Sequence, residues 1–174
     1  MINALISALI CGGAAVLEGV AAGRGVRARF TELRLPPCSP PLALWVGIGL
    51  AYYVICFAVL VRLLALSTSV LRAAALGLLL AILLVNAGWG VLFFRLKDVR
   101  ASYLAFFPYA VLVLALGGLL VRIDPIGACI LLPYLMYLVY ATWWGRALWR
   151  LNDLEALMRD AYDAHAKAPR RPLG

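Results

Sequence analysis

Five long apolar stretches separated by short polar segments make up most of this sequence. Each contains about 20 residues or more, the length that an α-helix needs to cross the hydrocarbon core of a bilayer. The pattern therefore predicts an all-α integral membrane protein with a five-helix transmembrane domain over residues 1–150. The expected helices cover residues 3–22, 44–66, 70–94, 101–121 and 126–149.

The first stretch also resembles the apolar part of a signal peptide. No basic residue precedes it, and Glu18 interrupts it near its end. Neither feature is typical of a signal peptide, so this stretch is predicted to be a retained helix.

The polar stretch 151–174 has apolar side chains at helical spacing. Asn152, with Glu155 three residues later, resembles a capping box that begins a new helix. These features predict a separate cytoplasmic amphipathic helix, followed by a disordered tail.

The composition agrees with a membrane location, because 66% of the 174 residues are hydrophobic. The formal net charge of +8 would suggest nucleic acid in a soluble protein, but here the basic residues follow the loops. The positive-inside rule predicts an external N-terminus and a cytoplasmic C-terminus, in a bacterial cell membrane. The bilayer is the expected partner, and nucleic-acid binding is not indicated. Basic residues expected in the cytoplasm are Arg24, Arg27, Arg29, Arg34, Arg95, Lys97, Arg100, Arg146, Arg150, Arg159, Lys167, Arg170 and Arg171.

Metal and haem chemistry are not indicated. The cysteines form no CxxC pair, and the single histidine, His165, lies in the tail. These features argue against a zinc site and against a haem held by histidine within the membrane, so no metal or cofactor is expected. No nucleophile–base pair or phosphate loop is present, and no catalytic residue is predicted.

One face of the fifth stretch carries the residues of a candidate pocket. Tyr134, Tyr137, Ala141 and Gly145 recur every three or four residues and therefore share a helix face. In the third stretch, Asn86 and Trp89 share a face in the same way, and an amide in hydrocarbon is expected to face the bundle interior. The alternatives are a lipid-facing fifth helix anchored by its aromatic residues, and an asparagine that only joins helices.

The connection 23–43 is longer than the other loops and carries several arginines and four prolines. It is predicted to form a lid, with Arg27, Arg29 and Arg34 placed to contact anionic ligand groups. The alternative is a solvated basic loop that only fixes the orientation. Ala73, Gly77 and Ala81 form a ridge of small residues at which another helix can approach closely.

Three motifs in order resemble the TspO/MBR family, which includes the tryptophan-rich sensory protein and the translocator protein. The third stretch has the family's Asn, its Trp and its Phe pair. The fifth stretch has the family's Pro-Tyr-Leu motif and several residues that follow this motif in the family. The segment before the second stretch has the family's proline motif. These residues are Asn86, Trp89, Phe93 and Phe94; Pro133, Tyr134, Leu135, Tyr137, Tyr140, Ala141 and Thr142; and Leu35, Pro36, Pro40, Pro41, Trp45 and Tyr53.

The resemblance implies a five-helix bundle, often homodimeric, with a pocket that opens toward the first loop and accepts porphyrins or sterols. It also implies that Ala73, Gly77 and Ala81 lie in the dimer interface. The expected ligand-binding positions are Trp45, Gly49, Tyr53, Asn86, Trp89, Tyr137, Tyr140 and Ala141.

The sequence departs from the family pattern mainly at positions linked to the pocket. Tryptophan is replaced at Cys38, Gly49 and Tyr137, an aspartate is replaced by Ala105, and an asparagine is replaced by Gly145. The resemblance therefore supports the predicted fold more strongly than it supports a particular ligand.

The leading functional hypothesis is a membrane receptor or sensor that binds a flat hydrophobic ligand, a porphyrin or a sterol, with a regulatory or transport-related role. An alternative is an enzyme that degrades porphyrin in light with oxygen, although two tryptophans suited to that chemistry are replaced by Gly49 and Tyr137. Transport is less favoured, since no charged residue is expected in the middle of a span. A scaffold that binds a partner protein is the remaining alternative.

Overall fold

The computed structural model describes residues 1–167, without the side chains of residues 154–157 and 160–167. All of its regular elements are helices, and five of them are long and apolar enough to cross a membrane, which confirms the predicted fold class. The elements are α1 (Ile2–Ala22), α2 (Val26–Glu32), α3 (Leu42–Ala65), α4 (Val70–Gly90), the π-helix η1 (Val91–Arg95), α5 (Val99–Ile123) and α6 (Pro125–Lys167).

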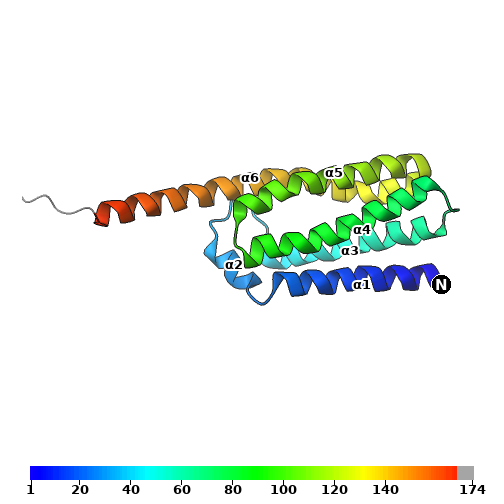
Figure 1. The fold of residues 1–174 in the computed structure, drawn as a ribbon, viewed down its shortest axis with the longest axis horizontal. Coiled ribbons are helices and arrows are strands. Elements are labelled where there is room, and N and C mark those ends of the chain that lie inside the picture. The colour runs from blue at the N-terminus through cyan, green and yellow to red at the C-terminus, as the bar shows by residue number, and fades with distance from the viewer. Residues whose placement is uncertain (168–174) are drawn as a thin grey trace, which may run out of the picture.

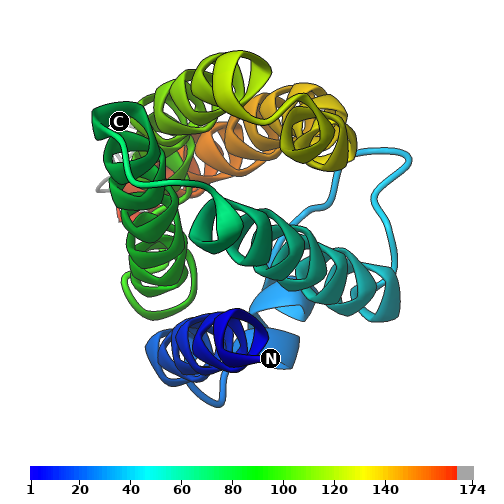
Figure 2. The same ribbon diagram turned by 90° about the vertical axis from the view of Figure 1, so that its right-hand side faces the viewer.

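The five long helices run along a common direction, and the short helix α2 lies across one end of them (Figure 1). Seen from the opposite end, they form a ring in the order α1, α3, α6, α5, α4 (Figure 2). Each helix in the ring packs against its two neighbours, and α3 also contacts α4 across the interior. This closure buries the inward faces of apolar helices while their outer faces remain available to lipid.

The interior is filled by aliphatic side chains in the half of the bundle away from α2. Val59 and Leu63 of α3 and Val113 and Leu116 of α5 have no exposed surface. Such residues recur every three or four positions, so the helical periodicity directs them to one side. The close packing here contrasts with the end near α2, where larger aromatic residues predominate.

Two arginines join neighbouring helices at the end of the bundle that carries the N-terminus. Arg62 on α3 forms a two-pronged ion pair with Asp124, which lies in the tight connection between α5 and α6, with N–O distances of 2.6 and 2.7 Å. Arg72 on α4 donates to the carbonyl oxygens of Leu63 and Leu64 in the last turn of α3, where few backbone N–H groups remain to pair with the carbonyls.

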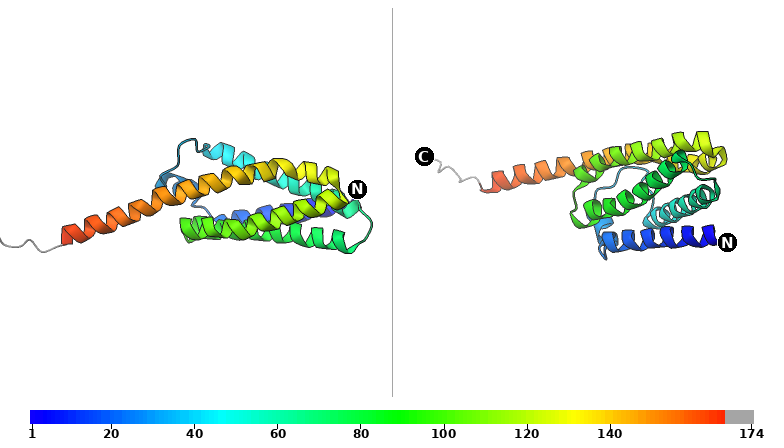
Figure 3. Two further views of the ribbon diagram at one scale, coloured as in Figure 1. Left: turned by 90° about the horizontal axis from the view of Figure 1, so that it is seen from above. Right: turned by 45° about the vertical axis from the view of Figure 1, so that its right-hand side comes forward.

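The fifth spanning helix does not end at residue 149 as expected. Helix α6 continues to Lys167 and projects far beyond the bundle (Figure 3). No glycine or proline interrupts residues 150–167, so the helix has no reason to stop at the membrane surface. Asn152 lies inside this helix, where its side chain bonds the backbone of Arg34 instead of capping a new helix. The predicted tail falls partly on residues 168–174, which lie outside the described residues.

The other boundaries agree with the expected spans to within two residues, except at the end of α4. The last turn there is the π-helix η1, in which Leu96 N–H bonds to Val91 C=O at 2.9 Å. The wider turn changes the direction of the side chains that follow Gly90. Its residues Leu92 and Phe93 face the interior near α2, where the candidate site lies.

Candidate ligand-binding cavity

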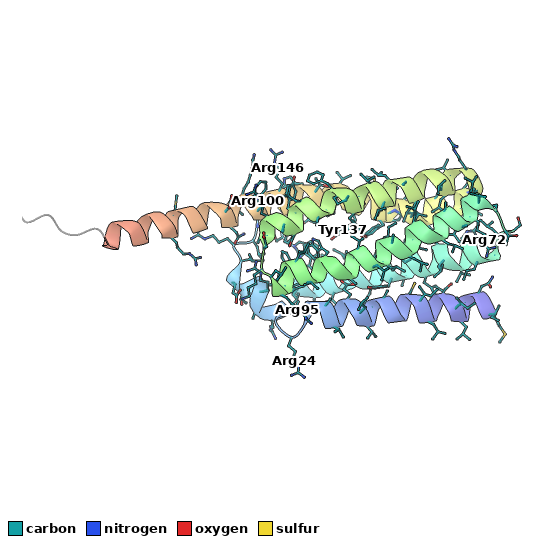
Figure 4. The ribbon with its side chains drawn as sticks, viewed as in Figure 1. Arg24, Arg72, Arg95, Arg100, Tyr137 and Arg146 are labelled. Atoms are coloured by element: carbon teal, nitrogen blue, oxygen red, sulfur yellow. The ribbon has the colours of Figure 1, made fainter. Side chains whose placement is uncertain are left out.

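A cavity of about 330 Å³ lies inside the bundle near its α2 end. The residues around it come from the first turns of α3 and α5, the last turns of α4, η1 and the middle of α6. Tyr137 is seen within the bundle in Figure 4. The lining residues are Trp45; Val85, Asn86, Gly88 and Trp89; Leu92 and Phe93; Val99, Ser102, Tyr103, Ala105, Phe106 and Tyr109; and Tyr134, Tyr137, Ala141, Trp144, Gly145 and Leu148.

The face of the fifth stretch that was predicted to line a pocket points into this cavity. Tyr134, Tyr137, Ala141 and Gly145 all lie on its wall. The two small residues leave space between the phenol rings and the neighbouring helix α5. A methyl group added at Gly145 would come within 3.2 Å of the Tyr103 ring, so glycine permits the close approach of these helices.

Aromatic rings form much of the remaining wall. Trp45 packs against Trp144 with ring centroids 4.8 Å apart, and Trp89 stacks on Phe93 at 4.9 Å with an interplanar angle of 11°. Tyr137 lies edge-on to Trp45 at 6.5 Å. The cavity therefore offers broad aromatic surfaces, which suit contact with a flat apolar molecule.

Few polar atoms on the wall are available to a ligand. The indole N–H of Trp89 donates to the Ser102 carbonyl at 3.0 Å, and the hydroxyls of Tyr109 and Tyr134 bond each other. The indole N–H of Trp45 is buried and has no hydrogen-bond partner among the described residues. A buried donor without a partner is costly, so an acceptor that reaches this N–H after a small shift of the ring would stabilise it.

Three of the predicted ligand-binding residues lie away from the wall. Gly49 is on α3 with open space around it, and Tyr53 bonds to α1. Tyr140 donates from its hydroxyl to the Cys38 carbonyl at 3.3 Å. The other five predicted positions, Trp45, Asn86, Trp89, Tyr137 and Ala141, line the cavity.

The segment after α2 covers the end of the bundle next to the cavity. The indole N–H of Trp144 donates to the Ser39 hydroxyl at 2.8 Å, and Tyr140 holds the Cys38 carbonyl. Cys38 has a left-handed backbone with φ of 64°, which lets the chain turn sharply at this point. Two contacts from α6 thus fix the loop above the aromatic wall.

The model of the TspO/MBR family matches residues 6–150, which include all or most of each of the five spans and every residue of the cavity wall. The chain belongs to the TspO/MBR family. No curated protein matches the sequence.

Within this TspO/MBR bundle, the three loop arginines have different surroundings. Arg29 is buried and donates to the carbonyls of Phe93 at 3.3 Å and Lys97 at 2.8 Å. These two hydrogen bonds of the guanidinium hold α2 against η1 and the residues that follow η1. Arg27 is exposed on α2, and the backbone of Arg34 is bonded on both sides to Asn152. No one of the three lines the cavity in the described structure.

An ion pair beside Arg29 joins the same two segments. Lys97 donates to both carboxylate oxygens of Glu32 at 2.8 and 2.9 Å. The Lys97 ammonium lowers the pKa of the Glu32 carboxyl, and Arg29 adds to this effect. Both partners of the pair are exposed, so it adds little to stability compared with the buried Arg29 contacts.

We expect Arg29→Gln to loosen α2 and the segment that follows it. Glutamine is too short to reach both carbonyls, so about 2 kcal/mol of local stability should be lost. Amide hydrogen exchange over residues 26–41 should then be about 30-fold faster. Arg27→Gln, an exposed change on the same helix, should leave the exchange unchanged. Equal exchange in the two variants would show that Arg29 does not hold α2.

Sequence reasoning missed two features of this site. The cluster of tryptophans near the end of the fifth stretch is typical of an aromatic belt at the headgroups, but Trp144 is buried against Trp45, while its neighbour Trp143 is exposed. Glu18 was taken only as marking the end of the first span. It lies inside α1 and bonds to Tyr53 and Asn86. An acidic residue within an apolar run was the signal that could have identified it.

No three His, Cys, Asp or Glu side chains come together to hold a metal ion in the part of the chain that the structure describes. The cavity wall offers aromatic surface with a few hydrogen-bonding atoms.

Proposed function

We propose that this TspO/MBR protein is a membrane receptor that binds a flat hydrophobic ligand of the porphyrin or sterol class inside the bundle. The observation that carries the proposal is the aromatic cavity of about 330 Å³ between α3, α4, η1, α5 and α6. Aromatic walls with few convergent polar atoms are typical of sites for small apolar molecules. Trp45, Asn86, Trp89, Tyr137 and Ala141 are the proposed contacts.

The volume of the cavity limits how such a ligand can be held. It lies at the lower end of the range for small-molecule sites. A porphyrin is large for this volume, so we expect its propionates to extend toward the loop, where the exposed Arg27 is the proposed partner for an anionic group. Movement of α2 and the segment around Cys38 would admit the ligand and would transmit its presence to the surface. Such a coupling would suit a sensory or regulatory role.

The test is a titration with protoporphyrin of the protein in nanodiscs, read in the dark by quenching of tryptophan fluorescence. We expect saturable quenching, because Trp45, Trp89 and Trp144 all face the cavity. Trp89→Leu should weaken the binding by about tenfold through loss of stacking surface. Trp143→Leu, at the exposed neighbour of Trp144, should leave the affinity unchanged. Absence of saturable quenching would contradict the porphyrin assignment.

The same sample tests the second candidate function, degradation of porphyrin in light. Three indoles beside the cavity favour it, since they would lie next to an excited ring. Loss of the porphyrin absorption band only under illumination and with oxygen would support the enzyme. A stable band with saturable binding would support the receptor alone.

We also propose that the end with α2 faces the cytoplasm. Arg24, Arg95 and Arg100 lie at this end, while Arg72 lies at the other (Figure 4), and cytoplasmic loops are enriched in such residues. The exposed Cys38 lies at the same end. A membrane-impermeant maleimide should therefore label Cys38 in inside-out vesicles and leave it unlabelled in intact cells, with Cys38→Ser as the blank. The reverse pattern would invert the proposed orientation.

The small-residue ridge on α4 is the proposed contact in a homodimer. Ala73 and Gly77 are exposed, and a side chain at Gly77 would meet nothing within 4 Å in one subunit. Gly77→Phe should therefore leave the monomer folded and separate the dimer, as measured by mass in detergent. Gly118→Phe, at an exposed glycine on α5 that is equally open, is the matched control. A dimer retained in Gly77→Phe would contradict this interface.

A further inference from the structure

Glu18 is a carboxylic acid within a spanning helix, and its hydrogen-bond partners Tyr53 and Asn86 are both uncharged. The Tyr53 hydroxyl donates to its Oε2 at 2.6 Å, and Nδ2 of Asn86 donates to the same oxygen at 3.1 Å. No lysine or arginine among the described residues forms an ion pair with Glu18. Arg95 donates to the carbonyl of Val20, two residues further along the chain, and not to the Glu18 carboxylate. An acid inside a span is costly to bury, so its place here calls for a role.

Asn86 connects this acid to the cavity. It lines the wall from α4, and its amide is the only side-chain amide among the described lining residues. An amide offers an N–H₂ group on one side and an oxygen on the other. A carboxylate oxygen can accept but not donate, so it fixes the N–H₂ group toward α1. The Asn86 oxygen, which accepts no hydrogen bond from the described residues, is then the atom left for a ligand.

We propose that Glu18 is a positioning residue that makes the cavity select ligands with a hydrogen-bond donor opposite Asn86. By holding Nδ2, it presents Oδ1 as an acceptor and disfavours the flipped amide. A ligand with an N–H or O–H group at this place gains a bond, whereas a ligand with a carbonyl there meets a second acceptor. The inference rests on the proposed function, because it concerns the specificity of the same cavity.

The Trp45 indole supplies the complementary group on the same wall. Its buried N–H has no partner among the described residues, and a small shift of the ring that brings it to the cavity surface would place a donor on the same wall as the Asn86 acceptor. The preferred ligand class is therefore a flat aromatic ring system that carries both an N–H or O–H group and an acceptor. Because Trp45 does not contact Glu18, its contribution should stay constant when Glu18 is changed.

The experiment compares three flat tricyclic probes of nearly equal shape. Carbazole has an N–H donor, fluorene has a CH₂ group and fluorenone has a carbonyl acceptor at the equivalent position. Affinities are measured by equilibrium dialysis with the full chain in nanodiscs, and empty nanodiscs are subtracted. For the unmodified protein, we expect carbazole to bind about three- to tenfold more tightly than fluorene.

The variants separate orientation of the amide from packing. Glu18→Leu keeps the bulk and removes the acceptor, so the advantage of carbazole should disappear and fluorenone should gain relative to fluorene. Glu18→Gln should restore part of the preference, since its side-chain oxygen can still accept from Asn86. Asn86→Leu should abolish the preference. Tyr53→Phe removes a bond to the same carboxylate oxygen but leaves the Asn86 contact, so it should keep the preference.

Two results would overturn the inference while leaving the receptor proposal standing. One is equal binding of carbazole and fluorene to the unmodified protein. The other is an equal loss for all three probes in Glu18→Leu, which would show that Glu18 acts only on stability. Failure of every probe, and of protoporphyrin, to bind would contradict the proposed function and the inference with it.

Discussion

Replacing Ala141 by phenylalanine is expected to weaken protoporphyrin binding by about 100-fold or more. Ala141 lies on the α6 wall of the cavity, one turn from Tyr137 and beside Gly145. A benzyl ring there would occupy the space that a ligand needs, and the surrounding aromatic rings cannot move aside without disturbing α5. The helices around the cavity are closely packed, so a ligand would have to displace the new ring to enter. The dark fluorescence titration measures the loss.

The control for Ala141→Phe is the same substitution on the lipid-facing side of the bundle. Ala115 is exposed on α5 and does not line the cavity, so Ala115→Phe should bind protoporphyrin like the unmodified protein. The thermal midpoint of Ala141→Phe should stay within a few degrees of the unmodified value, because the ring fills empty apolar space. An unchanged affinity in Ala141→Phe would place the ligand outside this cavity.

The fold and one wall of the cavity could be predicted because they depend on local periodicity. Apolar runs long enough for a bilayer leave the chain few alternatives to helices. The 3.6-residue period then brings Tyr134, Tyr137, Ala141 and Gly145 to one face. The order of helices in the ring and the contacts of Trp45 with that face depend on packing between distant segments, which periodicity alone does not specify.

The features that were missed depend on contacts between distant parts of the chain. Trp143 and Trp144 are adjacent, so either of them can face inward until Trp45 and Ser39 come into place. Arg29 was expected to meet a ligand, but its acceptors are backbone carbonyls exposed by η1 and by the left-handed residue Lys97. Nothing in the sequence indicates that a π-helix forms there.

Glu18 shows the same limitation. A single acid near the end of an apolar run is consistent with either the end of a helix or a buried polar site. Only the packing of α1 against α3 and α4 brings Tyr53 and Asn86 within hydrogen-bond distance of it. The sequence predicted that Asn86 faces the bundle interior, and the structure identifies Glu18 as its partner there.

Replacing Asp124 by asparagine is expected to lower the thermal midpoint by about 5 to 10 °C. Asp124 is buried and bonds Arg62 with both oxygens, joining α3 to the connection between α5 and α6. Asparagine keeps the shape and the ability to accept from the first turn of α6, so the change isolates the loss of charge. Asp98→Asn is the matched control, since Asp98 caps α5 but is exposed.

The stabilisation that Asp124 provides should also depend on pH. The Arg62 guanidinium lowers the pKa of the Asp124 carboxyl below its ordinary value near 4, and backbone N–H groups of α6 add to this effect. The folded protein therefore holds this proton less tightly than the unfolded chain does. The stabilisation is complete above pH about 4 to 5 and is lost as the pH falls through the lowered pKa. Thermal unfolding in detergent at pH 7 and at pH 3 measures it.

The difference in midpoint between the unmodified protein and Asp124→Asn should therefore be largest at neutral pH and should shrink in acid. Glu32 titrates in the same direction, but it is present in both proteins and its contribution cancels in the difference. A difference that stays constant with pH would mean that Asp124 stabilises the bundle through its shape and not through its charge. In that case Arg62 would be held by other contacts, and α3 would not depend on this ion pair for its position beside the cavity.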